Sequence, residues 1–400
     1  MTAAAAQVPQ GPQGRATRLL HAGAPALRGG SGPVNVPVVR TSTVRFENQQ
    51  AYAEHHHRRA AGERVASYGR HGLDTHRALE DAVAGLEGGY RAFLAPSGLA
   101  AITLVLLGLL SPGDHALVAD GVYSPLRRVD ATLLQRLGIV LEYVVPTPEA
   151  LAEKIRPTTR LVYLESPSSL LYQVLDLPAL AAVAARHGIP VATDNTWSGG
   201  WFHQPLALGA NVSLQASTKY IAGHSDLMQG VVVVDSPALA ARIAAAHEAL
   251  GLTVGADDAY LALRGVRTLP VRLAQHQRHA TEVARWLQRQ PQVARVFYPA
   301  LPDDPGHALW ARDFSGANGL VSFAFAEGTP VAAAHAFVDA LRRFGIGASW
   351  GGYESLALLA APSRLQEHSY WAGTAPVVRL HIGLEDPHDL VADLAQAFGR

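Results

Sequence analysis

Strand-like and helix-like patterns alternate along the middle of the chain. Short apolar runs rich in Val, Ile and Leu predict strands, and longer runs with apolar residues three or four apart predict helices. The expected strands are residues 115–119, 139–144, 160–164, 189–193, 212–216 and 230–234, mostly separated by helices such as 126–137 and 177–187. This alternation predicts an α/β domain with a largely parallel sheet, in which ligands gather at the carboxyl ends of the strands.

Just before this region, a strand leads directly into a glycine and a helix. A helix pattern begins near Thr75 and ends at Gly88, a short strand at 91–94 follows, and Ser97-Gly98 then precedes an apolar helix at 99–110. A glycine at a helix start exposes backbone N–H groups at the positive end of the helix dipole, which suits a phosphate. Serine before a helix is also an ordinary N-cap, so both interpretations stay open.

The pattern changes after about residue 255. Helices are expected at 259–263 and 272–289, a strand at 293–297, and further strands and helices at 320–325, 333–343, 377–382 and 390–398. These elements predict a smaller α+β unit. We therefore divide the chain into a tail and arm (1–66), a large α/β domain (67–255) and a C-terminal α+β domain (256–400), with a cleft between the two domains.

The N-terminal part shows little sustained periodicity. Residues 1–14 are rich in Ala, Gln, Gly and Pro and predict a disordered tail without the pattern of a signal peptide. Residues 15–66 predict an extended arm. It contains the run His55-His56-His57-Arg58-Arg59, which we interpret as a solvated charged turn, because adjacent side chains point in different directions and form a poor metal site.

Composition narrows the classes of function. Lys plus Arg and Asp plus Glu both number 33, so the net charge is zero and no basic stripe favours nucleic acid. No apolar run is long enough to cross a bilayer. Cysteine is absent, which excludes disulfides, thiolate nucleophiles and zinc–thiolate sites and fits a cytoplasmic enzyme. No metal site is expected.

Lysine is rare in this chain, and Lys219 stands out for that reason. Only Lys154 and Lys219 are lysines; every other residue among the 33 basic ones is arginine. A guanidinium stays protonated and cannot form an imine, whereas a desolvated amine can lose its proton and attack a carbonyl. Lys154 lies in a predicted surface helix beside Glu153 and needs no special role. Lys219 follows a predicted strand and precedes glycine and histidine, which makes it a candidate Schiff-base lysine.

Six segments, in this order, resemble the pyridoxal-phosphate enzymes of cysteine and methionine metabolism. They are SYGRHG at 67–72, LESPSS at 164–169, DNTW at 194–197, STKYIAGHSD at 217–226, SWGGYESL at 349–356 and RLHIGLE at 379–385. The resemblance covers nearly the whole chain from about residue 15. It implies a fold-type I, aspartate-aminotransferase-like architecture, with a large mixed and mostly parallel sheet domain and a smaller C-terminal α+β domain.

The resemblance implies that the chain binds pyridoxal 5′-phosphate. Lys219 would hold the cofactor and later act as the base, Asp194 would pair with the pyridine nitrogen, and Tyr123 would stack on the ring. The phosphate ligands would be the backbone N–H groups of Gly98 and Leu99, the Thr218 hydroxyl and, from a neighbouring subunit, Tyr68 and Arg70. A dimer would then be the smallest complete active site, and the family implies a tetramer. Taken singly, Asp194 could be a helix N-cap and Tyr123 a core aromatic.

The resemblance also implies how substrate is held. Arg379 would clamp the substrate α-carboxylate with its planar fork, with Ser349 and Trp350 nearby; taken alone, Arg379 could equally be a surface ion pair. The aromatic form of the segment 349–356 is most similar to that of the family's β carbon–sulfur lyases. The expected reaction is therefore α,β-elimination of L-cystathionine to homocysteine, pyruvate and ammonia, as in trans-sulfuration and methionine biosynthesis.

Three departures from the family pattern concern the far end of the substrate. His71 replaces a second arginine, Arg128 replaces an acidic residue, and Ala348 replaces a tyrosine. A positive charge at position 128 would repel a distal ammonium. Alternatives are therefore a β-lyase for another S-substituted cysteine, a γ-lyase or γ-synthase of the same family, and a regulatory protein that binds the cofactor without turnover.

Overall fold

A seven-stranded mixed sheet forms the larger part of the protein. The computed structural model describes residues 14–25 and 29–399, so the predicted tail lies outside the described residues except for Gly14. The strand order is β1-β7-β6-β5-β4-β2-β3, with β7 antiparallel to its neighbours and the other pairs parallel. The strands are β1 (Arg91–Ala95), β2 (His115–Ala119), β3 (Val140–Val144), β4 (Thr159–Glu165), β5 (Val191–Asp194), β6 (Val212–Gln215) and β7 (Gly230–Val234).

Helices cover both faces of this sheet because side chains alternate between the faces along each strand. In β7, Val232 and Val234 face one hydrophobic cluster, which includes α4 (Gly98–Leu109), α7 (Leu177–Ala185) and α8 (Pro237–Ala249). Val231 and Val233 face a second cluster, with α3 (Asp74–Glu87) and the start of α9 (Ala256–Leu287). A strand buried on both faces reads as a continuous apolar run, as the sequence of β7 does.

A five-stranded sheet forms the second unit. Its order is β10-β11-β12-β9-β8, and its strands are β8 (Val293–Phe297), β9 (Leu320–Phe325), β10 (Gly345–Ile346), β11 (Leu356–Leu359) and β12 (Val377–His381). The helices of this unit are α10 (His307–Asp313), α11 (Val331–Ala340), α12 (Pro362–Leu365) and α13 (Pro387–Phe398). The two sheets with their helices confirm the predicted fold class.

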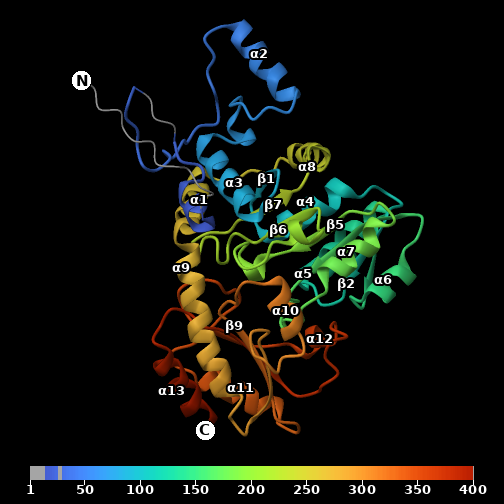
Figure 1. Cartoon of the computed structure of the whole chain (residues 1–400), viewed down its shortest axis with the longest axis vertical. Helices are drawn as coiled ribbons and strands as arrows, with labels where there is room; N and C mark the ends of the chain where they lie inside the picture. Colours follow the sequence, from blue (N-terminus) through green and yellow to red (C-terminus); the bar gives the residue numbers. More distant parts are fainter. Residues whose placement is uncertain (1–13, 26–28, 400) are drawn as a thin grey trace.

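One long helix joins the two units. Figure 1 shows α9 running from beside α3 past β9 to α13. The prediction of two separate helices at 259–263 and 272–289 is wrong, because Pro270 lies inside a single continuous helix. Proline removes one hydrogen bond of the ladder, but Val266, Leu269 and Leu273 are fully buried around it and hold the helix together.

The histidine run also differs from its prediction. Residues 55–59 lie in the helix α2 (Gln49–Ala60), not in a turn. Asn48 caps this helix, with the N–H of Ala51 2.8 Å from its Oδ1. None of its residues is buried, which explains why no apolar periodicity announced it. Figure 1 shows α2 projecting from the body of the protein. The other helix of this region, α1 (Arg15–His21), packs against α3 and α9.

The predicted helix at 126–137 is only partly regular. It consists of α5 (Pro125–Val129), a π-helical turn (Asp130–Leu134) and a 3₁₀ turn (Gln135–Leu137). The remaining helix of the large unit is α6 (Pro148–Lys154), which carries Lys154 on the surface as predicted. Among the described residues, no helix combines the length and apolar character needed to span a membrane.

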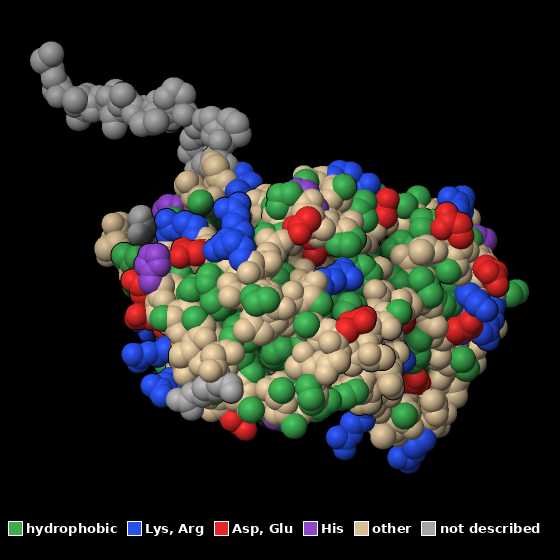
Figure 2. Space-filling view, turned by 90° about the horizontal axis from the view of Figure 1, so that it is seen from below, with side chains coloured by type: hydrophobic (Ala, Val, Ile, Leu, Met, Phe, Trp, Pro, Cys, Tyr) green, Lys and Arg blue, Asp and Glu red, His purple; other side chains and the backbone are tan. Residues whose placement is uncertain are grey.

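The surface in Figure 2 carries basic and acidic side chains interspersed with hydrophobic and uncharged ones. No continuous band of Lys and Arg crosses this face.

Candidate active site

Lys219 lies in the turn that follows β6, facing the second unit. Its Nζ donates to Ser349 Oγ at 2.5 Å and lies 5.3 Å from the centre of the Trp350 ring. Burial lowers the pKa of Lys219 to about 8; the charge of Arg379 lowers it further, and that of Asp194 opposes the shift. At pH 7 about a tenth of this amine is therefore unprotonated and nucleophilic, far more than for an ordinary lysine.

Asp194 ends β5 and is buried beside the same turn. Its Oδ1 accepts hydrogen bonds from the backbone N–H and the hydroxyl of Thr196, at 2.9 and 2.5 Å. The Thr196 hydroxyl in turn accepts from the N–H of Ala216 at 2.9 Å, which ties Asp194 to the Lys219 turn. Burial raises the pKa of Asp194 to about 6, against the hydrogen bonds of Thr196 and the charge of Lys219. A buried carboxylate without a hydrogen-bonded cation favours an incoming cation.

The start of α4 lies next to the Lys219 turn. Ser97 caps this helix, with the N–H of Ala100 3.1 Å from its hydroxyl. A Cβ added at Gly98 would lie 2.6 Å from Ala216 Cβ, so only glycine allows this approach. Within the described residues, the N–H groups of Gly98 and Leu99 have no acceptor, as expected at the positive end of a helix dipole. They are free to bind an anion.

The Thr218 hydroxyl is engaged in the fold itself. It accepts from the N–H of Gln229 at 2.9 Å and donates to the carbonyl of Gln229 at 3.0 Å. This bond pair closes the turn before β7. Its expected contact with a phosphate stays a prediction.

Tyr123 lies at the carboxyl edge of the sheet, near Asp194. It is 43% exposed, so the alternative of a core aromatic is wrong. Its N–H donates to Glu165 Oε2 at 2.6 Å. Burial, followed by the charge of Asp194, raises the pKa of Glu165 well above its usual value. Burial also raises the pKa of Tyr123, so its hydroxyl stays protonated at neutral pH.

Arg379 on β12 faces Lys219 from the second unit. Its Nη2 donates to the Ser349 carbonyl at 2.9 Å, and its Nε is buried without a hydrogen-bond partner among the described residues. No carboxylate of the described residues pairs with it, so the alternative of a surface ion pair is wrong. Ser349 has a left-handed backbone, with φ of 78°, a conformation that costs a non-glycine residue about 1–3 kcal/mol. A buried guanidinium that has no carboxylate partner among the described residues suits a carboxylate ligand.

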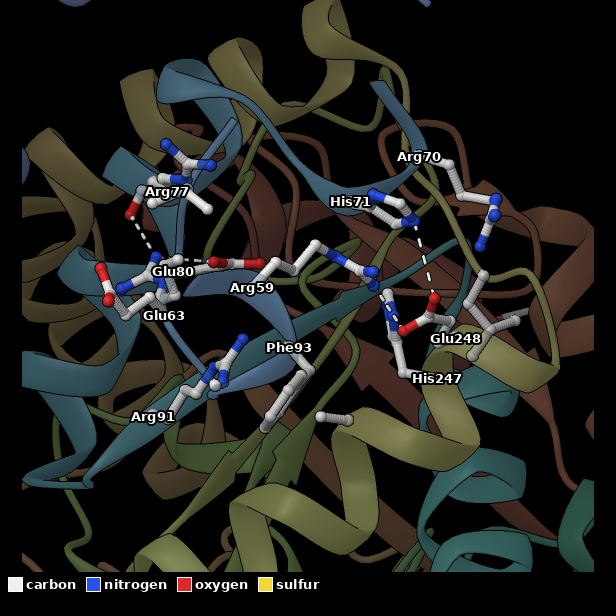
Figure 3. Close-up of a pocket in the computed structure, with 15 residues that line it drawn as sticks. Arg59, Glu63, Arg70, His71, Arg77, Glu80, Arg91, Phe93, His247 and Glu248 are labelled. Carbon is white, nitrogen blue, oxygen red and sulfur yellow. Dashed lines mark hydrogen bonds and ion pairs between the residues drawn. The ribbon is translucent and has the colours of Figure 1, made fainter. Parts of the chain in front are cut away.

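Two predicted cofactor ligands lie elsewhere on the chain. Tyr68 is 43% exposed and precedes a 3₁₀ turn (Gly69–His71). Figure 3 shows Arg70 and His71 in a separate pocket, beside His247 and Glu248 of α8. Neither Tyr68 nor Arg70 contacts Lys219, Asp194 or Arg379 within one chain.

Sequence reasoning gave no role to three residues of this site. Glu165 and His381 lie inside the segments 164–169 and 379–385, which carry the family resemblance. An acidic residue and a histidine next to apolar strand residues are the signal that could have identified them. Arg364 lies on the single-turn helix α12, which no periodicity announced. Its charge opposes the rise in the pKa of Tyr123 that burial causes, and its Nε is buried without a partner among the described residues.

The residues present fit pyridoxal phosphate. Its aldehyde needs an amine of lowered pKa, which Lys219 supplies; its ring nitrogen needs a buried carboxylate, which Asp194 supplies. Its phosphate needs free N–H groups at a helix start, which Gly98 and Leu99 supply. Hydrogen bonds through Thr196 and Ala216 join Asp194 to the Lys219 turn, and Gly98 packs directly against Ala216.

Comparisons with known proteins agree with this fit. A sequence model of the family described as Cys/Met metabolism PLP-dependent enzymes matches residues 16–399. The chain is 54% identical over 372 residues to the cystathionine beta-lyase of Bordetella avium, covering 93% of each protein. It is 39% identical to the cystathionine beta-lyase of Escherichia coli strain K12, covering 92% of this chain and 94% of that protein.

A solved structure extends the likeness to the fold. The cystathionine gamma synthase from Xanthomonas oryzae pv. oryzae, in complex with aminoacrylate and cysteine, superimposes with a TM-score of 0.87 at 33% identity. The match covers 97% of this chain and 98% of that chain. The same architecture therefore occurs in a relative named for γ-chemistry, so the overall fold does not separate the two reactions.

Proposed function

Because the chain belongs to the Cys/Met metabolism family of PLP-dependent enzymes, we propose that it is a β carbon–sulfur lyase that cleaves L-cystathionine to homocysteine, pyruvate and ammonia. The observation that carries this proposal is the contact of the Ser349-Trp350 segment with Lys219, at 2.5 Å from Ser349 Oγ. This aromatic segment is the feature that favours β- over γ-elimination, and the similar proteins from Bordetella avium and Escherichia coli carry the name cystathionine beta-lyase.

Pyridoxal phosphate, when bound, supplies an electron sink for the substrate α-carbon. Lys219 is the group that holds the cofactor and then takes the proton from the α-carbon at its Nζ, for which a pKa of about 8 is well placed. The electron pair left by that proton expels the sulfur from the β-carbon as a thiolate. From its buried position, Asp194 would hold a proton on the ring nitrogen of the bound cofactor.

Arg379 is the anchor for the substrate α-carboxylate. Its Nη2 binds the carbonyl of Ser349, whose hydroxyl contacts Lys219 Nζ, so the guanidinium lies beside the Lys219 amine. A bidentate guanidinium–carboxylate pair fixes orientation as well as position. Ser349, Trp350 and Tyr123 line the near end of the substrate.

The far end of the substrate meets a different set of charges. Arg128 stands where an acid would meet a distal ammonium, and Arg364 adds a second guanidinium near Tyr123. We assign Arg364 to the distal carboxylate of cystathionine. Glu367, which lies 3.6 Å from Arg127 and 3.4 Å from the Ser124 hydroxyl, brings an acidic group to the same wall and can serve the distal ammonium in place of an acid at position 128.

The catalytic unit we propose is a dimer, which pairs into a tetramer. Tyr68 and Arg70 are remote from Lys219 of their own chain and would complete the phosphate site of the neighbouring subunit. Support comes from the exposed side chain of Tyr68 and from α2, a helix with no buried residue. Residues 15–66 would then be the arm that contacts the neighbour, ahead of domains at 67–255 and 256–400. The lack of cysteine supports a cytoplasmic location.

The deciding experiment is to incubate the purified, cofactor-loaded protein with L-cystathionine and identify the keto acid released. Pyruvate with homocysteine supports the β-lyase. Release of 2-oxobutyrate would show γ-elimination and overturn it. Rapid pyruvate release from S-methyl-L-cysteine without turnover of cystathionine would keep the β-lyase and reject cystathionine as substrate. A loaded protein that releases no keto acid from either would be a regulatory binder.

A further inference from the structure

His381 is a fully buried histidine beside the active site whose hydrogen bonds define its protonation. It lies on β12 two residues after Arg379, so both side chains project from the same face of the strand. Its Nδ1 lies 2.9 Å from the Glu354 carbonyl, and the N–H of Gly351 donates to its Nε2 at 3.1 Å. A carbonyl can only accept and an N–H can only donate, so the ring is neutral with its hydrogen on Nδ1.

The surroundings of His381 keep it neutral. The ring of His276 lies 5.2 Å away and that of Tyr220 6.0 Å away, and no carboxylate of the described residues hydrogen-bonds to it. Burial, with the charge of His276, lowers the pKa of His381 well below its usual value. A second ring proton would also point an N–H at the N–H of Gly351. The imidazole therefore acts as a fixed donor–acceptor pair.

The two hydrogen bonds of His381 hold the segment 349–354, and this segment contacts Lys219. Arg379 binds it at the Ser349 carbonyl, and His381 binds it at Gly351 and Glu354. Ser349 has φ of 78° and Gly351 has φ of 92°. A left-handed serine persists only where the residues around it fix the backbone, and here hydrogen bonds fix the backbone at Ser349 itself, at Gly351 and at Glu354.

Small movements of this segment reach Lys219 directly. A Cβ added at Gly351 would lie 2.9 Å from Lys219 Cα, so the two backbones are in contact. Ser349 Oγ accepts from Lys219 Nζ, and the Trp350 ring covers the same amine. The low pKa of Lys219 depends first on its burial, and these two side chains supply part of that burial.

We propose that His381 is a positioning residue that, as the neutral Nδ1–H tautomer, clamps Gly351 and Glu354 and so fixes Ser349 and Trp350 against Lys219. His381 does not touch the reacting atoms itself. The kinetic part of this proposal rests on the proposed lyase function, whereas the effect on the Lys219 amine does not.

Two substitutions separate the two hydrogen bonds. In His381→Asn the amide can replace the Nδ1 donor but does not reach Gly351. In His381→Gln the amide can replace the Nε2 acceptor and loses the bond to Glu354. His276→Asn is the matched control, because His276 is an equally buried neighbour that binds the Ile382 carbonyl at 2.8 Å and does not contact the segment 349–354.

The first readout is the Lys219 amine in the full-length protein after removal of the cofactor. Labelling with [ε-¹³C]lysine gives only two NMR signals, because Lys154 and Lys219 are the only lysines. We expect His381→Asn to move the pKa of Lys219 from about 8 toward the ordinary value of 10.5. His381→Gln should move it less and His276→Asn should leave it unchanged, with Lys154 as internal reference.

The second readout is steady-state pyruvate release by the cofactor-loaded variants. We expect kcat to fall about 10-fold or more in His381→Asn, by less in His381→Gln, and little in His276→Asn, because a small misplacement of a catalytic group is costly. Equal behaviour of His381→Asn and His276→Asn in both readouts would overturn the clamp. The clamp would also be overturned if His381→Asn lost thermal stability while the pKa of its Lys219 stayed unchanged. If the loaded wild type releases no pyruvate, the proposed function fails, and the NMR titration alone decides the clamp.

Discussion

The side-chain amide of Asn195 donates to both oxygens of the Glu87 carboxyl group, with Nδ2 3.0 Å from Oε2 and 3.2 Å from Oε1. Asn195 follows the candidate cofactor ligand Asp194, and Gln215 at the end of β6 also donates to Glu87. Burial raises the pKa of Glu87 to about 7, against these hydrogen bonds. A buried carboxyl group of α3 thus supports the loop behind the active site.

This buried carboxyl predicts a pH-dependent stability. The pKa of Glu87 is higher in the folded protein than in the unfolded chain, so the folded state binds more protons between pH 4.5 and about 7. Stability from this group therefore falls as pH rises through that window, by about 2 kcal/mol between pH 5.5 and 8. Urea unfolding at the two pH values should show a loss about 2 kcal/mol larger in the wild type than in Glu87→Gln, in which the buried Asp194 and Glu165 still titrate. An equal loss in both proteins would assign it to other groups.

The scarcity of lysine gives a matched pair of variants. Lys219→Arg should lower pyruvate release at least about 1000-fold, because a guanidinium neither forms an imine nor accepts the α-proton. It should also remove the visible absorbance of the bound cofactor. Lys154→Arg should change neither, since Lys154 is a surface residue 3.7 Å from Glu142. Substantial activity in Lys219→Arg would exclude the assigned base.

Arg364 and Arg128, which we place at the far end of the substrate, should have separable effects on the KM for L-cystathionine. Arg364→Gln should raise the KM for L-cystathionine roughly 10-fold, the cost of losing a hydrogen bond to a charged group. The KM for S-methyl-L-cysteine, which has no distal carboxylate, should stay unchanged. Arg128→Gln should instead lower the KM for L-cystathionine, because it removes a positive charge that would repel the distal ammonium. A rise in both KM values for Arg364→Gln would place that residue at the near end of the substrate.

Co-expression of two inactive variants tests the shared active site. Lys219→Ala and Arg70→Ala each spoil both sites of a homodimer, whereas a mixed dimer keeps one site with Lys219 from one chain and Arg70 from the other. Random pairing should then restore about a quarter of the wild-type activity. Failure of the mixture, with both variants soluble and folded, would place Arg70 in the site of its own chain, and full activity of Arg70→Ala alone would place it outside any site.

The strands with continuous apolar sequences could be predicted from the sequence. The expected ranges at 115–119, 230–234, 293–297 and 320–325 match β2, β7, β8 and β9 at both ends, because Val, Leu, Ala and Phe runs there are bounded by turn residues. Pro270 misled the helix prediction, since tertiary packing overrides a local breaker. The helix α2 could not be found, because it has no buried face.

The sequence predicted those site residues whose residue type alone indicates their chemistry, such as a lysine or an arginine. Lys219, Asp194, Ser349 and Arg379 do lie together, as expected from their segments. The roles of Glu165 and His381 depend on burial and on backbone partners more than 20 residues away in the chain, such as the N–H of Tyr123 for Glu165 and the Glu354 carbonyl for His381. Periodicity and spacing carry no such information, so these contacts required the structure.

The helix α9 has a mechanical consequence for the enzyme. Its first half packs on α3 of the large unit and its second half on β8, β9 and α13 of the small unit, so one continuous helix connects the two units. If the small unit rotates so that Arg379 moves toward or away from Lys219, α9 must bend. Pro270, at the middle of α9, has no N–H to donate to the Val266 carbonyl. The missing hydrogen bond therefore lies at the position where α9 would bend.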